Sequence, residues 1–324
     1  MSETNSVTSA ESAKGRSVGS RIMIGLIKAV LTGLLVYYVA RQVWINWDQV
    51  KAHEWHIDYL RLVGSFIVAA LALLVFSASW RRIISGFGHR LPLWGAFRIL
   101  NLSNLGRYIP GRIWQVFGML YLAKQKGVPE EQAAASFVIY ELFTLPASLL
   151  VWVIAAQFEP ALLIDKFKIM GPGSAYAIGI AALAGCALLV LWPQPFIRLA
   201  NRLLKRLGRP AVVFDLHKGV ALQIFAGYFV GWILFGLAFW LFLGSVLGDR
   251  APSALVAVGL YNVAYQIGYL ALFAPGGLGP RELVMGLLLE PFVGPLGAAV
   301  AVLARVWSAL IDTSAALMAL GIRK

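Results

Sequence analysis

Long apolar segments alternate with short polar stretches along most of the chain. A helix needs about 20 apolar residues to cross the hydrocarbon core of a bilayer, which is about 30 Å thick. Six segments meet this length with few charges: Ile22–Val43, Tyr59–Trp80, Ala133–Ala156, Ser174–Trp192, Val220–Val246 and Pro295–Leu320. The pattern predicts an all-α integral membrane protein with six spanning helices.

Two further apolar segments, Leu93–Ala123 and Ser253–Glu290, are interrupted by proline, glycine and arginine. The first contains GRYIPGR (Gly106–Arg112) and the second contains APGGLGPRE (Ala274–Glu282). Backbone that leaves the helix at bilayer depth is tolerated only when it is buried in protein or lines a polar cavity. An arginine at that depth also costs about 2.5 to 3.5 kcal/mol on insertion scales. We therefore expect two re-entrant or broken-helix hairpins, with a functional site where they occur.

Lysine and arginine flanking the spans predict the orientation of the chain. Four groups should be cytoplasmic: Lys14, Arg16 and Arg21; Arg81, Arg82 and Arg90; Arg198, Arg202, Lys205, Arg206, Arg209 and Lys218; Arg323 and Lys324. The opposing loops carry mixed charge, so both termini are expected in the cytoplasm. The third group, Arg198–Lys218, is interleaved with apolar residues at helical spacing. This pattern predicts an amphipathic helix on the inner leaflet, with an apolar face made of Phe196, Leu199, Ala200, Leu203 and Leu207.

This topology makes the two halves of the chain inverted with respect to the membrane. Each half has two spans, a hairpin and a third span, giving pseudo-repeats over about residues 21–156 and 174–320. The first hairpin should enter from the cytoplasm and the second from outside. Interrupted segments at corresponding positions of two halves indicate a transporter site at the midplane. We expect residues 1–20 to be a disordered cytoplasmic tail and 21–324 to be a single membrane domain.

Composition agrees with a membrane protein and limits the chemistry. Hydrophobic residues make up 60% of the chain and charged residues 13%, with a mean hydropathy of +0.76, which excludes an ordinary soluble globule. The net charge of +13 lies beside apolar spans, so it predicts contact with anionic lipid headgroups and not with nucleic acid. Cys186 has no partner for a disulfide, and we interpret His53 and His56 as solvated loop residues rather than metal ligands. We expect no cofactor, no metal and no enzymatic activity.

Each half also places one charge inside the span that follows its hairpin. Glu141 lies 31 residues after Pro110, and Arg305 lies 30 residues after Pro275. One hypothesis is that these opposite charges pair across the pseudo-twofold axis. The alternative is that each bonds separately to backbone or to hydroxyl groups such as Thr144 and Ser308.

These motifs resemble the lysylphosphatidylglycerol synthase transmembrane family. The likeness lies in GRYIPGRIW, AKQKGV and the span with Glu141, then in APGGLGPRE and the span with Arg305. The resemblance implies movement of a lipid between leaflets of a bacterial inner membrane, because the membrane half of the synthases is regarded as a flippase. The synthases carry a soluble aminoacyl-transferase domain after this region, so a chain that stops at Lys324 is not expected to make aminoacylated lipid by itself. The family's second acid is replaced here, since Glu141 is followed by LFTL.

The expected mechanism is electrostatic. Arg107, Arg112 and Arg281 lie at helix breaks, where exposed N–H groups and helix N-termini favour anions such as a phosphate headgroup. Glu141 and Glu282 would balance the charge or accept a cationic headgroup. The predicted site further includes Arg305, the break residues and polar or aromatic lining: Pro110, Gly111, Pro275, Gly276, Gly277, Gly279, Tyr108, Trp114, Gln115, Tyr140, Tyr261, Asn262 and Gln266.

Other interpretations of the same residues stay open. Arg107 and Arg112 are also compatible with snorkelling to the cytoplasmic interface. Arg281 with Glu282 are compatible with a local pair that caps a short helix, Leu283–Leu289. The tyrosines, Asn262 and Gln266 are compatible with helix packing. For the whole protein, the expected function is a translocator of an anionic, aminoacylated or polyprenyl-phosphate-linked lipid. The alternative is a membrane enzyme, or the membrane partner of a glycosyl- or aminoacyl-transferase, acting on a lipid-linked substrate.

Overall fold

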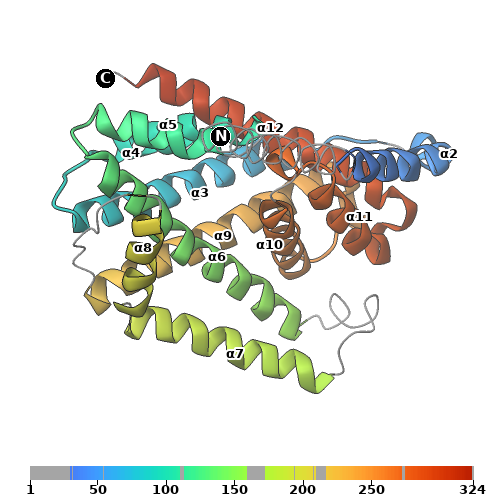
Figure 1. Cartoon of the computed structure of the whole chain (residues 1–324). Coiled ribbons are helices and arrows are strands. Elements are labelled where there is room, and N and C mark those ends of the chain that lie inside the picture. The colour runs from blue at the N-terminus through green and yellow to red at the C-terminus, as the bar shows by residue number, and fades with distance from the viewer. Residues whose placement is uncertain are drawn as a thin grey trace, which may run out of the picture.

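The computed structural model describes residues 30, 32–53, 55–109, 113–158, 172–192, 194–206, 208, 217–271 and 274–322. Within these residues the regular elements are all helical, which confirms the predicted all-α class (Figure 1). The predicted tail, the start of the first span and the extreme C-terminus lie outside this part of the chain.

Four helical stretches in the described part are long and apolar enough to cross a membrane: Tyr59–Gly86, Glu130–Phe158, Lys218–Arg250 and Pro280–Gly321. They contain helices α3 (Tyr59–Gly86), α6 (Glu130–Phe158), α9 (Lys218–Leu247) and α12 (Gly297–Gly321), each of which covers a predicted span. The predicted span Ser174–Trp192 is helix α7 (Pro172–Leu191), and the described end of the first span is helical over residues 32–45.

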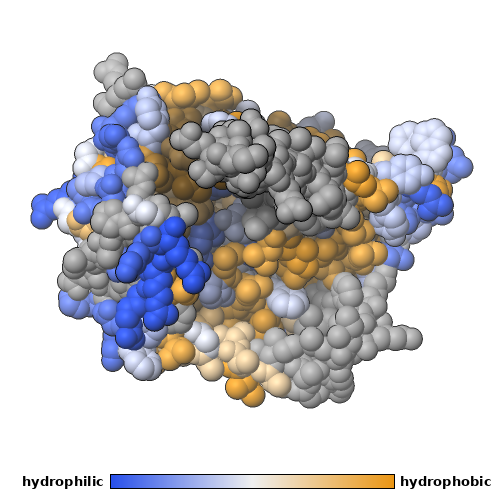
Figure 2. All heavy atoms as spheres, viewed as in Figure 1, coloured by the Kyte–Doolittle hydropathy of each residue, from blue (hydrophilic) through white to orange (hydrophobic). Residues whose placement is uncertain are grey.

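Polar helices lie at the two ends of this bundle. Helix α8 (Gln194–Arg206) exposes Arg198, Arg202, Lys205 and Arg206, whereas the short helix α2 (Trp47–Ala52) lies at the opposite end (Figure 1). Figure 2 shows hydrophobic side chains across the middle of this face and hydrophilic ones gathered toward both ends. This distribution is that of a multi-pass membrane protein.

Helices α3 and α9 form the most extensive helix pair of the core. Small residues allow the close approach, because a Cβ on Gly231 would lie 2.3 Å from the ring of Phe76. Gly236 plays the same part against α10 (Ala254–Leu270), where a Cβ would lie 2.7 Å from the Cα of Val258. Small residues at helix contacts are the usual means by which helices associate in membranes.

The segment Leu93–Ala123 forms the first predicted helix pair. Helix α4 (Leu93–Asn104) leads into a 3₁₀ turn, η1 (Leu105–Tyr108), and helix α5 (Ile113–Lys124) packs back against α4. Each arm has 12 residues, or about 18 Å, which is too short to cross the hydrocarbon core. Gly106 is required at the turn, since a Cβ there would lie 2.5 Å from the backbone nitrogen of Gln115.

The segment Ser253–Glu290 forms the second pair, α10 and α11 (Pro280–Val293), joined through the 3₁₀ turn η4 (Pro275–Gly277). The arms have 17 and 14 residues, so each is about 21 to 26 Å long. Glycines with φ of +56°, +74° and +93° break the helix at 276, 277 and 279. No continuous helix therefore runs through Pro275.

The helix contacts of one half recur in the other half. Helix α4 packs on α12, the last helix of the second half, while α10 packs on α6, the last helix of the first half. The α4–α5 pair lies at the end of the molecule that carries α8, and the α10–α11 pair lies at the end that carries α2 (Figure 1). The turns η1 and η4 are in contact, so the two breaks meet inside the bundle.

Candidate functional site

Arg305 joins the two helix breaks. It extends from α12 and donates a hydrogen bond from Nη1 to the carbonyl oxygen of Gly276, at 2.8 Å. Its guanidinium carbon lies 5.6 Å from the ring centroid of Tyr108 in η1. Gly276 has a φ of +56°, which favours glycine, and a Cβ there would displace the Arg305 guanidinium, whose Nη2 would lie 2.9 Å away.

Glu282 begins helix α11 and also faces Arg305. The Gly279 N–H donates to Glu282 Oε2 at 2.7 Å, which satisfies one of the free donors of the helix N-terminus. The other carboxylate oxygen lies 3.5 Å from Arg305 Nη1. Glu282 therefore caps the helix as predicted, whereas Arg281 does not take part in the cap. The helix is also longer than the predicted Leu283–Leu289, since it runs from Pro280 to Val293.

Arg107 forms a second ion pair, with Asp312 of α12. Arg107 Nη1 also donates to the hydroxyl of Tyr265 at 3.0 Å, and the Tyr108 hydroxyl donates to Asp312. Arg107 thus bonds to groups of the second half rather than snorkelling freely. Asp312 was not among the predicted residues, although an acid inside an apolar span, two helical turns after Arg305, is a signal of function.

Arg281 is the exception among the three central arginines of the described residues. Its residue is 5% exposed, and its guanidinium lies over the rings of Tyr261 and Tyr265, 5.2 Å from each centroid. No carboxylate of the described residues forms an ion pair with it, and its buried Nη2 atom has no hydrogen-bond partner. Within the described part of the chain, Arg281 is therefore a buried cation without an ion-pairing carboxylate.

Glu141 does not pair with Arg305. It accepts a hydrogen bond from the hydroxyl of Tyr269, while Arg305 is held by Gly276 and Glu282. The hypothesis of a direct pair is wrong, and the alternative of separate partners holds, with a tyrosine and a backbone carbonyl in those places. The reason is rotational: sequence spacing sets the depth of a residue along a helix but not the direction in which that helix turns its face.

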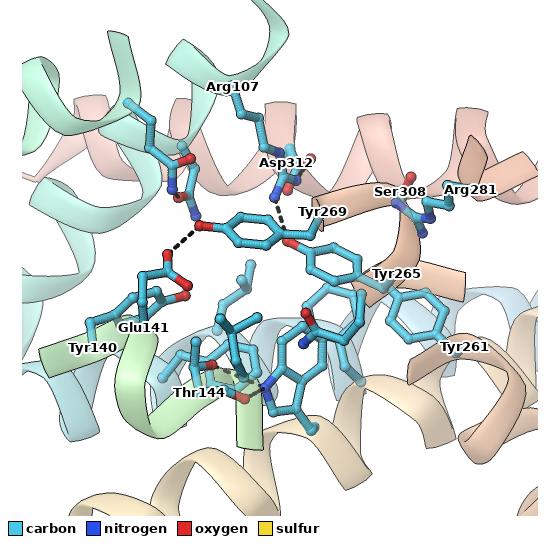
Figure 3. Close-up of a pocket in the computed structure, with 18 residues that line it drawn as sticks. Arg107, Tyr140, Glu141, Thr144, Tyr261, Tyr265, Tyr269, Arg281, Ser308 and Asp312 are labelled. Atoms are coloured by element: carbon cyan, nitrogen blue, oxygen red, sulfur yellow. Dashed lines mark hydrogen bonds and ion pairs between the residues drawn. The ribbon is translucent and has the colours of Figure 1, made fainter. Parts of the chain in front are cut away.

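A row of tyrosines links the two charges. Tyr261, Tyr265 and Tyr269 recur every four residues on one face of α10, and consecutive rings are stacked at centroid distances of 6.0 and 6.5 Å. Figure 3 shows Glu141 near the Tyr269 end of this row and Arg281 at the other end. The arrangement gives the site one acidic and one basic end.

These groups line a cavity of about 50 Å³, which we call the central cavity (Figure 3). A water molecule needs about 10 to 15 Å³ of such space, so the cavity holds only a few waters. A smaller space of about 20 Å³ continues beside it, between Arg107, Arg281 and Arg305. The polar and charged lining of the central cavity comprises Asn104, Arg107, Gln115, Tyr140, Glu141, Thr144, Tyr261, Tyr265, Gln266, Tyr269, Arg281, Ser308 and Asp312.

Several predicted residues lie elsewhere. Trp114 is 49% exposed on the outside of α5 and does not line the cavity. Asn262 accepts from Ser148 Oγ at 2.8 Å and donates to backbone carbonyls, so it holds helices together as the packing interpretation expects. Gly277 also serves packing, since a Cβ there would lie 2.7 Å from the carbonyl oxygen of Gly268. The predicted residues Pro110, Gly111 and Arg112 lie outside the described residues.

The sequence comparison identifies the family. The family model of the lysylphosphatidylglycerol synthase transmembrane region matches residues 25–315, which includes both breaks and every charged residue of the central cavity. The chain belongs to this family. No curated protein matches the chain. Membership in the family, together with the apolar helices, indicates a membrane protein with a lipid-related function.

Proposed function

We propose that this protein is a lipid translocator of the bacterial inner membrane, with both termini in the cytoplasm. It moves a lipid with a phosphate-bearing headgroup, which is anionic, aminoacylated or polyprenyl-phosphate-linked, from one leaflet to the other. The headgroup passes through the central cavity while the acyl chains stay in the bilayer, and the lipid is not chemically changed.

Arg281 is the observation that carries this proposal. A buried charge without a partner is costly, and proteins keep such charges where a ligand supplies the counter-ion. Guanidinium is the side-chain group best suited to phosphate, because its planar donors match two phosphate oxygens at once. The absence of an ion-pairing carboxylate among the described residues leaves this cation for an incoming headgroup.

The placement of the helix breaks supports transport. We propose that α4–α5 and α10–α11 are re-entrant hairpins that enter the membrane from opposite faces, between six spans in two inverted repeats. Their short arms and their positions at opposite ends of the bundle favour this arrangement (Figure 1). Broken helices that meet at the midplane form the substrate sites of many secondary transporters.

The small volume of the central cavity implies that the headgroup enters only when the breaks separate. A space of about 50 Å³ is filled by about four waters and is smaller than a phosphoglycerol group. Two ion pairs, Arg107 with Asp312 and Arg305 with Glu282, hold the arginines beside the cavity and would have to open before a headgroup could bind there. Exchange of these carboxylates for headgroup phosphate would open a path toward one leaflet at a time.

Liposomes test the proposal. Purified protein is reconstituted with fluorescently labelled phosphatidylglycerol, and the fraction reached by a membrane-impermeant quencher is followed in time. Wild-type protein should expose inner-leaflet lipid to the quencher, Arg281→Gln should abolish most of this movement, and Arg281→Lys should keep part of it because the charge remains without the planar donors. Arg250→Gln, a change at an exposed arginine, should behave as the wild type. Movement by Arg281→Gln at the wild-type rate would refute the proposal.

The same experiment separates the alternative function, a membrane enzyme or the membrane partner of a transferase. No soluble donor is present in these liposomes. A translocator should leave the lipid chemically unchanged by mass spectrometry, whereas protein that moves no lipid but consumes a lipid-linked sugar or an aminoacyl donor would support the alternative.

A further inference from the structure

A second cavity lies beside α11, apart from the central cavity. It has a volume of about 440 Å³ and is lined by the helix over residues 32–45, by α11 and by the start of α12. We call it the lateral cavity. Among the described residues it shares no lining residue with the central cavity, and its polar lining there is Tyr38, Gln42, Asn46, Glu282 and Glu290.

Glu282 is the residue through which the lateral cavity reaches the arginines. The residue is 6% exposed, and its two oxygens differ: Oε2 accepts from the Gly279 N–H, whereas Oε1 is buried without a hydrogen bond and faces Arg305 at 3.5 Å. Arg305 in turn lines the small space that it shares with Arg107 and Arg281. The Glu282–Arg305 contact therefore stands between the lateral cavity and the headgroup site.

The charged surroundings of Glu282 are few within the described residues. Helix α12 contributes Arg305, η1 lies behind it with Arg107 and Tyr108, and η5 (Gly294–Leu296) has no titratable side chain. Helix α10 directs Tyr261 and Tyr265 at Arg281, the neighbour of Glu282 on α11. Two further titratable groups line the lateral cavity, Tyr38 on the helix over residues 32–45 and Glu290 on α11 itself. Arg305 is thus the cation that balances Glu282.

We infer that Glu282 takes up a proton from the lateral cavity when a phosphate headgroup binds, and releases it when the headgroup leaves. The inference rests on the proposed function. A headgroup phosphate that bonds to Arg305 displaces the Glu282 carboxylate, and a buried carboxylate without its cation is costly. A hydronium ion in the lateral cavity then transfers its proton to Oε1, giving a carboxylic acid and water, while Arg305 keeps its charge.

The second carboxylate oxygen of Glu282, Oε2, allows the proton to bind and leave while helix α11 stays capped. Because Oε2 continues to accept from the Gly279 N–H in the protonated acid, α11 stays capped whether or not the proton is bound. Asp312 differs, since it faces the central cavity and not the lateral one. Proton uptake at Glu282 would couple lipid movement to the proton gradient across the membrane.

Calorimetric titration of the detergent-solubilised full chain tests the inference. The probe is short-chain phosphatidylglycerol, titrated in buffers of different ionisation enthalpy and at several pH values near neutrality. Wild-type protein should take up protons on binding, and its affinity should fall about tenfold per pH unit as the pH rises. Glu282→Gln, which retains an oxygen that can accept from the Gly279 N–H, should bind without proton uptake and without this pH dependence. Its melting temperature should fall because Arg305 loses its ion pair, but its helical circular dichroism spectrum should stay that of the wild type.

Control variants make the outcomes distinct. Asp249→Asn removes an exposed carboxylate and should leave proton uptake as in the wild type. Binding without proton uptake in the wild type, or uptake that Asp312→Asn abolishes and Glu282→Gln retains, would overturn the inference and leave the proposed function standing. Absence of binding by the wild type would overturn both.

Discussion

Replacing Asp312 by asparagine tests how the two halves of the protein are joined at the helix breaks. Asp312 lies on α12, is 7% exposed and accepts hydrogen bonds from Arg107 and Tyr108 of η1. Asparagine has the same shape but no charge. The substitution therefore leaves the buried Arg107 guanidinium with neutral partners, the Tyr265 hydroxyl and the amide oxygen of residue 312, in place of a carboxylate.

The expected loss is large because the charge that remains is buried. Removing one partner of a buried ion pair costs about 3 to 5 kcal/mol, which lowers the folding equilibrium constant by more than about two powers of ten. Arg107→Gln should destabilise the protein similarly, by leaving Asp312 without its cation. The double variant carries two neutral amides in place of the ions, so we expect it to be at least as stable as either single variant.

The measurement is a double-mutant cycle: the wild type, the two single variants and the double variant are each unfolded reversibly in mixed detergent micelles, and unfolding is followed by circular dichroism. The two single effects should fail to add. Because the double variant should cost no more than either single variant, the interaction energy should be at least about 3 kcal/mol in magnitude. The exposed pair Asp48 and Lys51, which lie 3.2 Å apart on α2, is the control and should show no measurable coupling. Strictly additive effects of the Arg107 and Asp312 variants would refute the ion pair between the first break and helix α12.

Further predictions concern the packing that shapes the site. Gly277→Ala should lower the melting temperature more than Gly88→Ala. Both glycines have positive φ, which costs an alanine about 1 to 2 kcal/mol. Of these two sites, only Gly277 would also bring the new Cβ against backbone, 2.7 Å from the Gly268 carbonyl oxygen. Equal losses would contradict the close contact of α10 with the second break. Trp232→Phe removes the indole hydrogen bond to the Thr144 hydroxyl, at 3.0 Å, and should destabilise the protein by about 1 to 3 kcal/mol in the same unfolding assay, with no loss if that bond is absent.

The long helices and the breaks were predictable from the sequence because each follows from a local rule. An apolar run long enough to cross a bilayer predicted α3, α6, α9 and α12, and the Pro-Gly elements predicted where the two short helix pairs are interrupted. The second of these elements contains three glycines at positive φ, Gly276, Gly277 and Gly279, a conformation that other residues adopt only with strain.

The partners of the charged residues were not predictable in the same way. Glu141 and Arg305 occupy matching positions in the two halves, yet the faces of α6 and α12 direct them to Tyr269 and to Gly276 with Glu282. Helix rotation depends on packing against every neighbour and has no short sequence signal. Asp312 was not predicted for another reason, because it lies inside a span that has no proline or glycine break to mark it.

For aromatic and amide residues near a break, the sequence did not indicate which side chains line the central cavity and which pack between helices. Gln115 and Trp114 are adjacent on α5, but the first lines the central cavity and the second is exposed. Asn262 and Gln266 lie one turn apart on α10, yet only Gln266 lines the cavity, while Asn262 bonds to neighbouring helices. Such residues serve packing and ligand contact equally well, and only the tertiary structure separates the two.

The most direct test of the account is the distance between a lipid phosphate and Arg281 in the membrane. Solid-state NMR on protein with ¹⁵N-labelled arginine, reconstituted in phosphatidylglycerol bilayers, measures ³¹P–¹⁵N dipolar coupling, and the Arg281 signal is assigned by its loss in Arg281→Lys. The account predicts a coupling that corresponds to hydrogen-bonding distance between the Arg281 guanidinium and phosphorus. A lipid-transporting sample in which the Arg281 signal shows no coupling to phosphorus would contradict it.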